Sequence, residues 1–253
     1  MNEALLGHLF PPKAAFSPPP RLRPFLSAPP LTVEEIDSAL SQSSSSSAPG
    51  PDGTGIPYLT WKMVNAISPT ILLQLLSPLV PMGYQPASLK VANGVVLDKL
   101  GKTSYQSSSF FRIIVLLPTV SKILDRIVAT RLGLWAPSRG LIHPNQYGSL
   151  PGLSTYDAGL TYVNDVKTLQ RLRLKVSSLF LDIKALFDKV DNATLARIVR
   201  EGGIPPYLVS WLSSFLGERR CTLVFQGAPG TQHPSISGPP RVPQSLPSFS
   251  SYR

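Results

Sequence analysis

The side chains best placed to do chemistry are two carboxylates in the segment 176–191, which reads VSSLFLDIKALFDKVD. An apolar run ends there on Asp182, and Asp188 follows directly after Phe187. A carboxylate at the end of a buried strand needs a partner charge or hydrogen bonds, because desolvating the charge is costly. One interpretation makes Asp182 a helix cap or an ion-pair partner, which is the commoner case. The other makes it a metal ligand on a rigid sheet edge, as in phosphoryl-transfer enzymes.

The elements that must position these carboxylates follow from hydrophobic periodicity. Residues 176–181 have the composition of a strand, because β-branched and aromatic residues dominate a run too short for a helix. Elsewhere the apolar residues recur at helical spacing, which predicts amphipathic helices. The predicted helices cover 58–66, 68–80, 121–132, 157–171, 193–201 and 205–216, and further strands are predicted at 91–97 and 221–226.

Capping residues mark where some of these helices begin and end. Thr32 and Glu35 have the spacing of a capping box at the start of a short helix. Asp191 or Asn192 is expected to cap a later helix, and Gly202 is expected to end that helix in the left-handed conformation.

The segment Phe180–Asp188, FLDIKALFD, resembles the first catalytic motif of non-LTR (LINE-type) reverse transcriptases, F-x-D-I-K-x-A-F-D. The resemblance implies that Asp182 is catalytic and binds two magnesium ions, with help from the backbone carbonyl of Ile183. It also implies that Phe187 shields the ribose 2′ position and so selects deoxynucleotides. Leu186 stands where the family carries alanine. A fungal-like member of the family is expected.

Other motifs match the same family in the same order. Residues 48–57, APGPDGTGIP, are similar to the A-P-G-P-D-G-I element that opens the fingers region. Lys99 and Lys102 match the lysines of P-K-P-G-K, which lie near template or nucleotide, although both prolines are replaced. Arg112 matches an arginine that meets the incoming triphosphate, a role suited to a bidentate guanidinium.

Two groups of basic residues are candidates for nucleic-acid contact. Lys122, Arg126 and Arg131 lie on the polar face of an amphipathic helix within FFRIIVLLPTVSKILDRIVATRL, the longest match to the family. This face is either simply solvated or directed at nucleic acid. Arg219 and Arg220 precede a predicted strand, where they lie in a surface loop or contact the nucleic-acid backbone.

The chain also departs from the family. Leu150 and Leu153 replace two arginines, and each exchange removes charge-assisted contacts of roughly 1.5–3 kcal/mol. Gln244, expected at the nucleotide, is the last match to the second conserved motif. The paired-aspartate hairpin of the family, F/Y-x-D-D, does not occur in the sequence. We therefore expect the chain to be inactive as written, and the alternative is a non-catalytic nucleic-acid-binding remnant of a retrotransposon.

Composition agrees with a polyanionic partner without requiring one. The net charge is +10, from 24 Lys and Arg against 14 Asp and Glu, and basic ribosomal, membrane-surface or disordered chains share this excess. The 27 prolines concentrate at the two ends, which argues against order there. The single cysteine, Cys221, has no disulfide partner within the chain, and no apolar run approaches the length of a membrane span. An intracellular protein is expected, either nuclear or cytoplasmic.

The resemblance implies an α+β fold, with the fingers and an incomplete palm of a right-hand polymerase and helices packed on an antiparallel sheet. It implies RNA template, DNA primer and dNTP as partners and Mg²⁺ as cofactor, bound weakly because a single family aspartate is present. The predicted regions are a Pro/Ser-rich segment (1–47) with a helix at 31–40, a fingers-like region (48–158), a partial palm (159–244) and a disordered tail (245–253).

Overall fold

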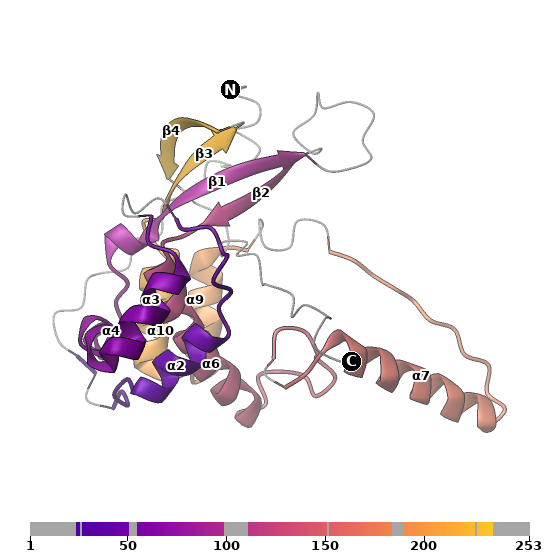
Figure 1. Cartoon of the computed structure of the whole chain (residues 1–253). Coiled ribbons are helices and arrows are strands. Elements are labelled where there is room, and N and C mark those ends of the chain that lie inside the picture. The colour runs from indigo at the N-terminus through magenta and orange to yellow at the C-terminus, as the bar shows by residue number, and fades with distance from the viewer. Residues whose placement is uncertain are drawn as a thin grey trace. The chain divides into compact units, whose positions relative to one another are not determined.

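The computed structural model describes residues 24–25, 27–50, 55–98, 111–150, 152–183, 190–225 and 227–234. It divides into two compact units (Figure 1). Unit 1 combines Met1–Val128 with Phe187–Arg253, and unit 2 is Ala129–Leu186. Each unit is described by itself below. The predicted tail at 245–253 lies outside the described residues, and the predicted N-terminal segment is described from residue 24 onward, residue 26 excepted.

Unit 1 contains a four-stranded mixed sheet with the order β2-β1-β3-β4. The neighbours β1/β2 and β3/β4 are antiparallel, whereas β1 and β3 are parallel. The expected α+β class is confirmed, but the expectation of an antiparallel sheet is corrected. Parallel pairing is possible because the long connection from β1 to β3 contains β2 and several helices. The strands are β1 (Val91–Asp98), β2 (Phe111–Leu116), β3 (Arg220–Phe225) and β4 (Ala228–Pro234).

The sheet packs closely around a glycine of β1. A Cβ on Gly94 would lie 2.9 Å from a methyl group of Leu223 and 3.0 Å from the Cys221 sulfur, so the side chains of β3 occupy the space that a side chain at position 94 would need. Ala92, Leu117 and Cys221 are buried together in this region. Burial raises the pKa of the Cys221 thiol to about 11, so the thiol stays protonated and packs as a small apolar group.

The helices of unit 1 form a group beside the sheet (Figure 1). The capping box predicted at Thr32 and Glu35 is present. The Thr32 hydroxyl accepts a hydrogen bond from the Glu35 amide at 3.3 Å, and the Glu35 carboxylate accepts one from the Thr32 amide at 3.1 Å. The helices are α2 (Val33–Ser41), α3 (Tyr58–Ile67), α4 (Pro69–Leu76), α5 (Leu79–Met82), the 3-10 helix η1 (Ala87–Lys90), α9 (Asn192–Glu201) and α10 (Pro206–Leu216). Helix α6 (Thr119–Ser138) begins in this unit.

Two predicted helix ends are corrected. The helix expected over 68–80 breaks into α4 and α5, because Pro78 has no amide hydrogen and its ring clashes with the preceding turn. Gly202 ends α9 with φ −68°, so the left-handed residue is Gly203, with φ +72°. Of the two residues expected as possible N-caps of α9, Asp191 is the one that caps it: its carboxylate accepts a hydrogen bond from the Thr194 amide at 2.8 Å.

Buried polar side chains join α6 and α10 to the sheet. Gln85 is fully buried, and its side-chain amide donates to the Ser121 hydroxyl at 2.9 Å. Its backbone amide donates to the Ser214 hydroxyl at 3.0 Å. The Lys90 ammonium, just before β1, donates to the Ser214 carbonyl at 3.1 Å. Because these groups are removed from water, the hydrogen bonds fix how α6, α10 and β1 meet.

Among the described helices, no single one is long and apolar enough to cross a membrane. Helix α3 together with Pro69–Met82 reaches the required length and composition as a pair, with a bend of 112° between the two parts.

Unit 2 consists of the end of α6, helix α7 (Thr155–Arg171) and an extended segment after it. A capping box between Ser154 and Asp157 starts α7. The extended segment runs back along α7, where the Tyr162 hydroxyl lies 2.7 Å from the Ser178 hydroxyl and its ring meets Phe180 edge-on at 5.9 Å. The prediction of a buried strand at 176–181 is wrong for this structure. A strand needs hydrogen bonds from a neighbouring strand, and no described strand pairs with this segment.

Candidate polymerase site

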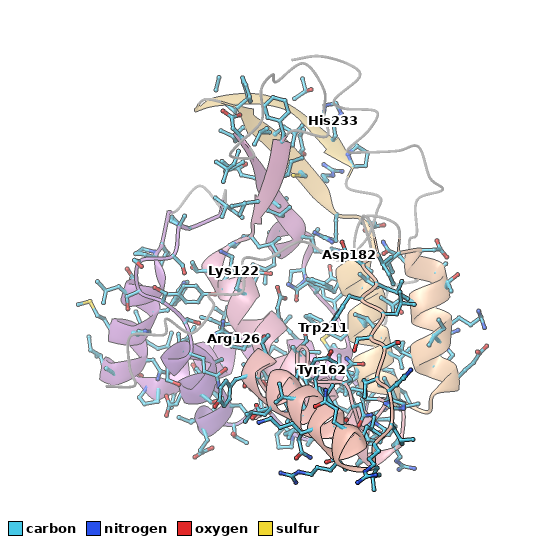
Figure 2. All side chains as sticks on the ribbon, turned by 90° about the vertical axis from the view of Figure 1, so that its right-hand side faces the viewer. Lys122, Arg126, Tyr162, Asp182, Trp211 and His233 are labelled. Carbon is cyan, nitrogen blue, oxygen red and sulfur yellow. The ribbon has the colours of Figure 1, made fainter. Side chains whose placement is uncertain are left out.

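Asp182, the residue at the centre of the predicted chemistry, is exposed to solvent at the end of the extended segment of unit 2 (Figure 2). Leu181 and Ile183 on either side are 84% and 67% exposed. The carboxylate is therefore open to water, contrary to the expectation for an aspartate that ends a buried strand. Phe187 and Asp188 lie outside the described residues.

Among the described residues, Asp182 is the carboxylate that the resemblance assigns to the magnesium site. Mg²⁺ is bound through oxygen atoms, usually by one or two carboxylates together with water and substrate phosphates. An open carboxylate such as Asp182 fits one of these positions, and the Ile183 carbonyl follows it in the chain. Within the described ranges, no cluster of three or more His, Cys, Asp or Glu side chains could hold a metal ion.

The residues expected at the nucleotide are described in part. Arg112 lies on β2, opposite Leu97 of β1, and its backbone is described while its side chain is not. Lys99, Lys102 and Gln244 lie outside the described residues. Arg112 belongs to unit 1 and Asp182 to unit 2.

The basic face of α6 makes internal contacts (Figure 2). The Lys122 ammonium donates to the carbonyl of Ala48 at 3.4 Å, and burial lowers its pKa while the nearby Asp125 raises it in part. The Arg126 guanidinium donates to the Ala39 carbonyl at 3.2 Å and to the Ser43 hydroxyl at 3.0 Å. Both cations therefore hold neighbouring chain against α6, which neither of the open interpretations had anticipated. Arg131, further along α6, is half-buried in unit 2.

The Ala48–Gly50 loop, which accepts the hydrogen bond from Lys122, also packs directly against the backbone of Leu117 and Pro118. A Cβ on Gly50 would lie 2.2 Å from the carbonyl carbon of Leu117, a distance that real Cβ atoms do not show. Glycine is required because the loop runs against the backbone between β2 and α6. The glycine of the A-P-G element is thus explained by packing.

Arg219 is buried, with 4% of its surface exposed, and its guanidinium lies over the Phe215 ring at 5.5 Å from the centroid. The alternative of a surface loop is therefore wrong for Arg219, because the turn after α10 directs its side chain inward. Burial lowers the pKa of the guanidinium to about 10, and the Asp125 charge opposes that shift. Arg220 is exposed at the start of β3.

Asp125 is a buried carboxylate with a shifted pKa that the sequence analysis did not identify as a candidate site residue. Both of its carboxylate oxygens are buried, and burial raises its pKa to about 8. The positive charges of Arg219 and Lys122 oppose the rise, and so does the Ser121 hydroxyl, although it makes no well-formed hydrogen bond to either oxygen. The sequence did contain a signal for its burial: Asp125 lies about one turn from positions of α6 on either side that are buried. The structure thus gathers Lys122 and Arg219 around Asp125, while Asp182 belongs to the other unit.

Residues 101–240 match the family "Reverse transcriptase (RNA-dependent DNA polymerase)". This match covers more than half of the chain and includes Asp182, so the protein belongs to the reverse transcriptase family.

The chain carries a LINE-type reverse transcriptase domain, and several of its relatives are described as RNA-directed DNA polymerases of mobile elements. It is 28% identical over 207 residues to the probable RNA-directed DNA polymerase from transposon X-element of Drosophila melanogaster, covering 82% of this chain and 22% of that protein. It is 26% identical over 211 residues to the RNA-directed DNA polymerase from mobile element jockey of the same organism, covering 83% and 23%. A putative 115 kDa protein in its type-1 retrotransposable element R1DM is 30% identical over 224 residues, covering 83% and 20%. The chain thus spans about a fifth of the length of these relatives.

Proposed function

We propose that this chain is part of the machinery for RNA-templated DNA synthesis by a non-LTR retrotransposon. The observation that carries the proposal is the family match over residues 101–240, which contains the Phe180–Asp188 motif. In this proposal residues 48–158 correspond to fingers and 159–244 to part of the palm. The partners are an RNA template, a DNA primer and deoxynucleotides.

Asp182 and the Ile183 carbonyl would hold magnesium, which when bound stabilises the attacking and leaving oxygens of the transfer. The chain's own residues orient the substrate. Phe187 excludes a ribose 2′-hydroxyl, and Arg112 contacts the triphosphate. Lys99, Lys102 and Gln244 line the nucleotide site in the same proposal.

We propose further that the 253-residue polypeptide binds nucleic acid without extending a primer. Two divalent ions in one site repel each other, and their charge must be offset by nearby anions. Asp182 is the carboxylate that the family motif assigns to this task here, and the described residues contain no group of three or more His, Cys, Asp or Glu side chains that could hold a metal ion.

The second candidate is binding without any catalytic role, favoured by the net charge of +10. Arg220 and the other exposed cations would then carry binding, whose affinity falls steeply as salt rises. In either case the protein is proposed to act inside the cell, and its fungal-like character stays a prediction.

The test is primer extension by the purified 253-residue chain on an RNA template with labelled dNTP and Mg²⁺, run beside Asp182→Asn. We expect retention of the RNA–DNA hybrid without extension in both proteins. Extension that is lost in Asp182→Asn would overturn the inactivity but support the polymerase. Failure of the chain to retain any nucleic acid would overturn both candidates.

A further inference from the structure

Helix α7 ends in a cluster of basic side chains that none of the family motifs includes. The sequence from Lys167 to Lys175, KTLQRLRLK, contains no acidic residue. Its basic residues are all exposed. We call them the α7 basic end: Lys167, Arg171, Arg173 and Lys175.

The α7 basic end is held in place by backbone geometry. Lys167 and Arg171 are four residues apart on α7, so they share one face at a separation of about 6 Å along the axis. The chain then turns at Arg173, whose φ of +58° is left-handed, and Leu174 donates a hydrogen bond to the Leu169 carbonyl at 3.0 Å. Arg173 and Lys175 therefore continue the row of basic residues in the sequence directly beyond the helix.

Helix stability alone does not account for this row. A cation in the last turn interacts favourably with the negative end of the helix dipole, and the effect fades within one turn. Arg171 is the basic residue of that last turn. Lys167 lies one turn earlier, and Arg173 and Lys175 follow the helix. In the part of the chain that the structure describes, none of these four side chains makes an ion pair or a hydrogen bond.

We infer that the α7 basic end binds the phosphate backbone of single-stranded RNA. The inference rests on the proposed function, since it supplies a contact for the template. Lys122 and Arg126 are engaged with Ala48, Ala39 and Ser43, so exposed cations elsewhere must supply phosphate contacts. An anionic lipid surface offers similar charge, and Leu172 and Leu174 are exposed between the cations. RNA is favoured because the chain belongs to a family of RNA-dependent polymerases.

The expected effect follows from counterion release. Each phosphate contact adds about 0.7 to the slope of log affinity against log salt for a single strand. Removing two contacts should lower the slope by about 1.4, which corresponds to a roughly tenfold loss of affinity near 0.15 M salt. Removing all four should lower the slope by about 2.8.

The experiment measures binding of the full chain to a fluorescent single-stranded RNA at several salt concentrations. The test variant is Lys167→Gln/Arg171→Gln, followed by the same variant with Arg173→Gln and Lys175→Gln added. The control is Arg197→Gln/Arg200→Gln, which removes two exposed helical cations from α9 in unit 1, one of them paired with Glu201, and changes the net charge equally. Circular dichroism checks that α7 persists.

We expect the α7 variant to lose about tenfold in affinity and the control to lose less than twofold. Equal losses of RNA affinity in the α7 variant and the control would mean that net charge alone drives binding. An unchanged RNA affinity in the α7 variant would exclude the site. Either result overturns this inference while the proposed function stands. A wild-type chain that binds no RNA overturns the proposed function as well. Binding to phosphatidylserine vesicles that the α7 variant loses, with RNA affinity unchanged, would assign the surface to lipid instead.

Discussion

Replacing Asp125 with asparagine should remove a pH dependence from the stability of unit 1. Both carboxylate oxygens of Asp125 are buried, and burial raises the pKa of the group from 3.8 to about 8 against the opposing charges of Arg219 and Lys122. In the unfolded chain the same group titrates near its ordinary value. Asparagine has nearly the same shape as the protonated acid and does not titrate.

The direction follows from proton binding. Between pH 3.8 and about pH 8 the folded state holds a proton on Asp125 that the unfolded state has released. The stabilising contribution is therefore complete below pH 3.8 and is lost as pH rises to about 8. One proton corresponds to about 1.4 kcal/mol per pH unit, so the free energy of unfolding should fall by up to ~3 kcal/mol between about pH 5 and pH 7.5.

The measurement is urea denaturation of wild type and Asp125→Asn at both pH values. Wild type should lose stability on going to the higher pH, while Asp125→Asn should change little. The control is Asp157→Asn. Hydrogen bonds from Ser154 lower the pKa of the exposed Asp157, so its contribution to stability is lost only as the pH falls below the range between about pH 5 and pH 7.5. Equal pH slopes for wild type and Asp125→Asn would show that Asp125 is ionised in the folded protein and would refute the reasoning.

Further substitutions test the packing around the same elements. Gly50→Ala should lower the melting temperature, since its Cβ would overlap the Leu117 backbone, at a cost of about 1–3 kcal/mol; an unchanged melting curve would mean that the loop does not pack there. Thr32→Ala should cost about 1 kcal/mol through loss of the α2 capping box, and Thr32→Ser should restore most of it. Leu223→Ala should cost about 2–5 kcal/mol in urea denaturation because Leu223 is fully buried in β3, whereas Leu59→Ala, at an exposed position, should cost far less.

The helices could be predicted from the sequence because their signals are local. Thr32 with Glu35 forms the predicted capping box, and the helices expected at 58–66, 157–171 and 205–216 all form within a few residues of their predicted bounds. The strand expected at 91–97 is confirmed as β1. Each of these segments carries its own apolar stripe or alternation, so little depends on distant partners.

Apart from the helix ends at Pro78 and Gly202, the errors have a different cause, which is dependence on a partner far away in the chain. Residues 176–181 have strand composition, but a strand forms only where another strand supplies hydrogen bonds. Conversely, β4 forms over Ala228–Pro234, a segment with little strand propensity, because β3 provides those bonds. Arg219 was expected in a surface loop or at nucleic acid, but it is buried over the Phe215 ring and within the electrostatic reach of Asp125, which is 94 positions earlier.

The candidate site divides in the same way. The motif around Asp182 could be identified from a few neighbouring residues, because the catalytic residues of the family lie in short sequence motifs. What each basic residue contacts could not be identified, since Lys122 and Arg126 have the sequence pattern of a solvated face and yet hold Ala48 and α2 against α6. A match to a nucleic-acid-binding family therefore fails to separate cations that hold the fold together from cations that are free to meet RNA. That separation requires the contacts, and in the described residues they leave the α7 basic end without internal partners.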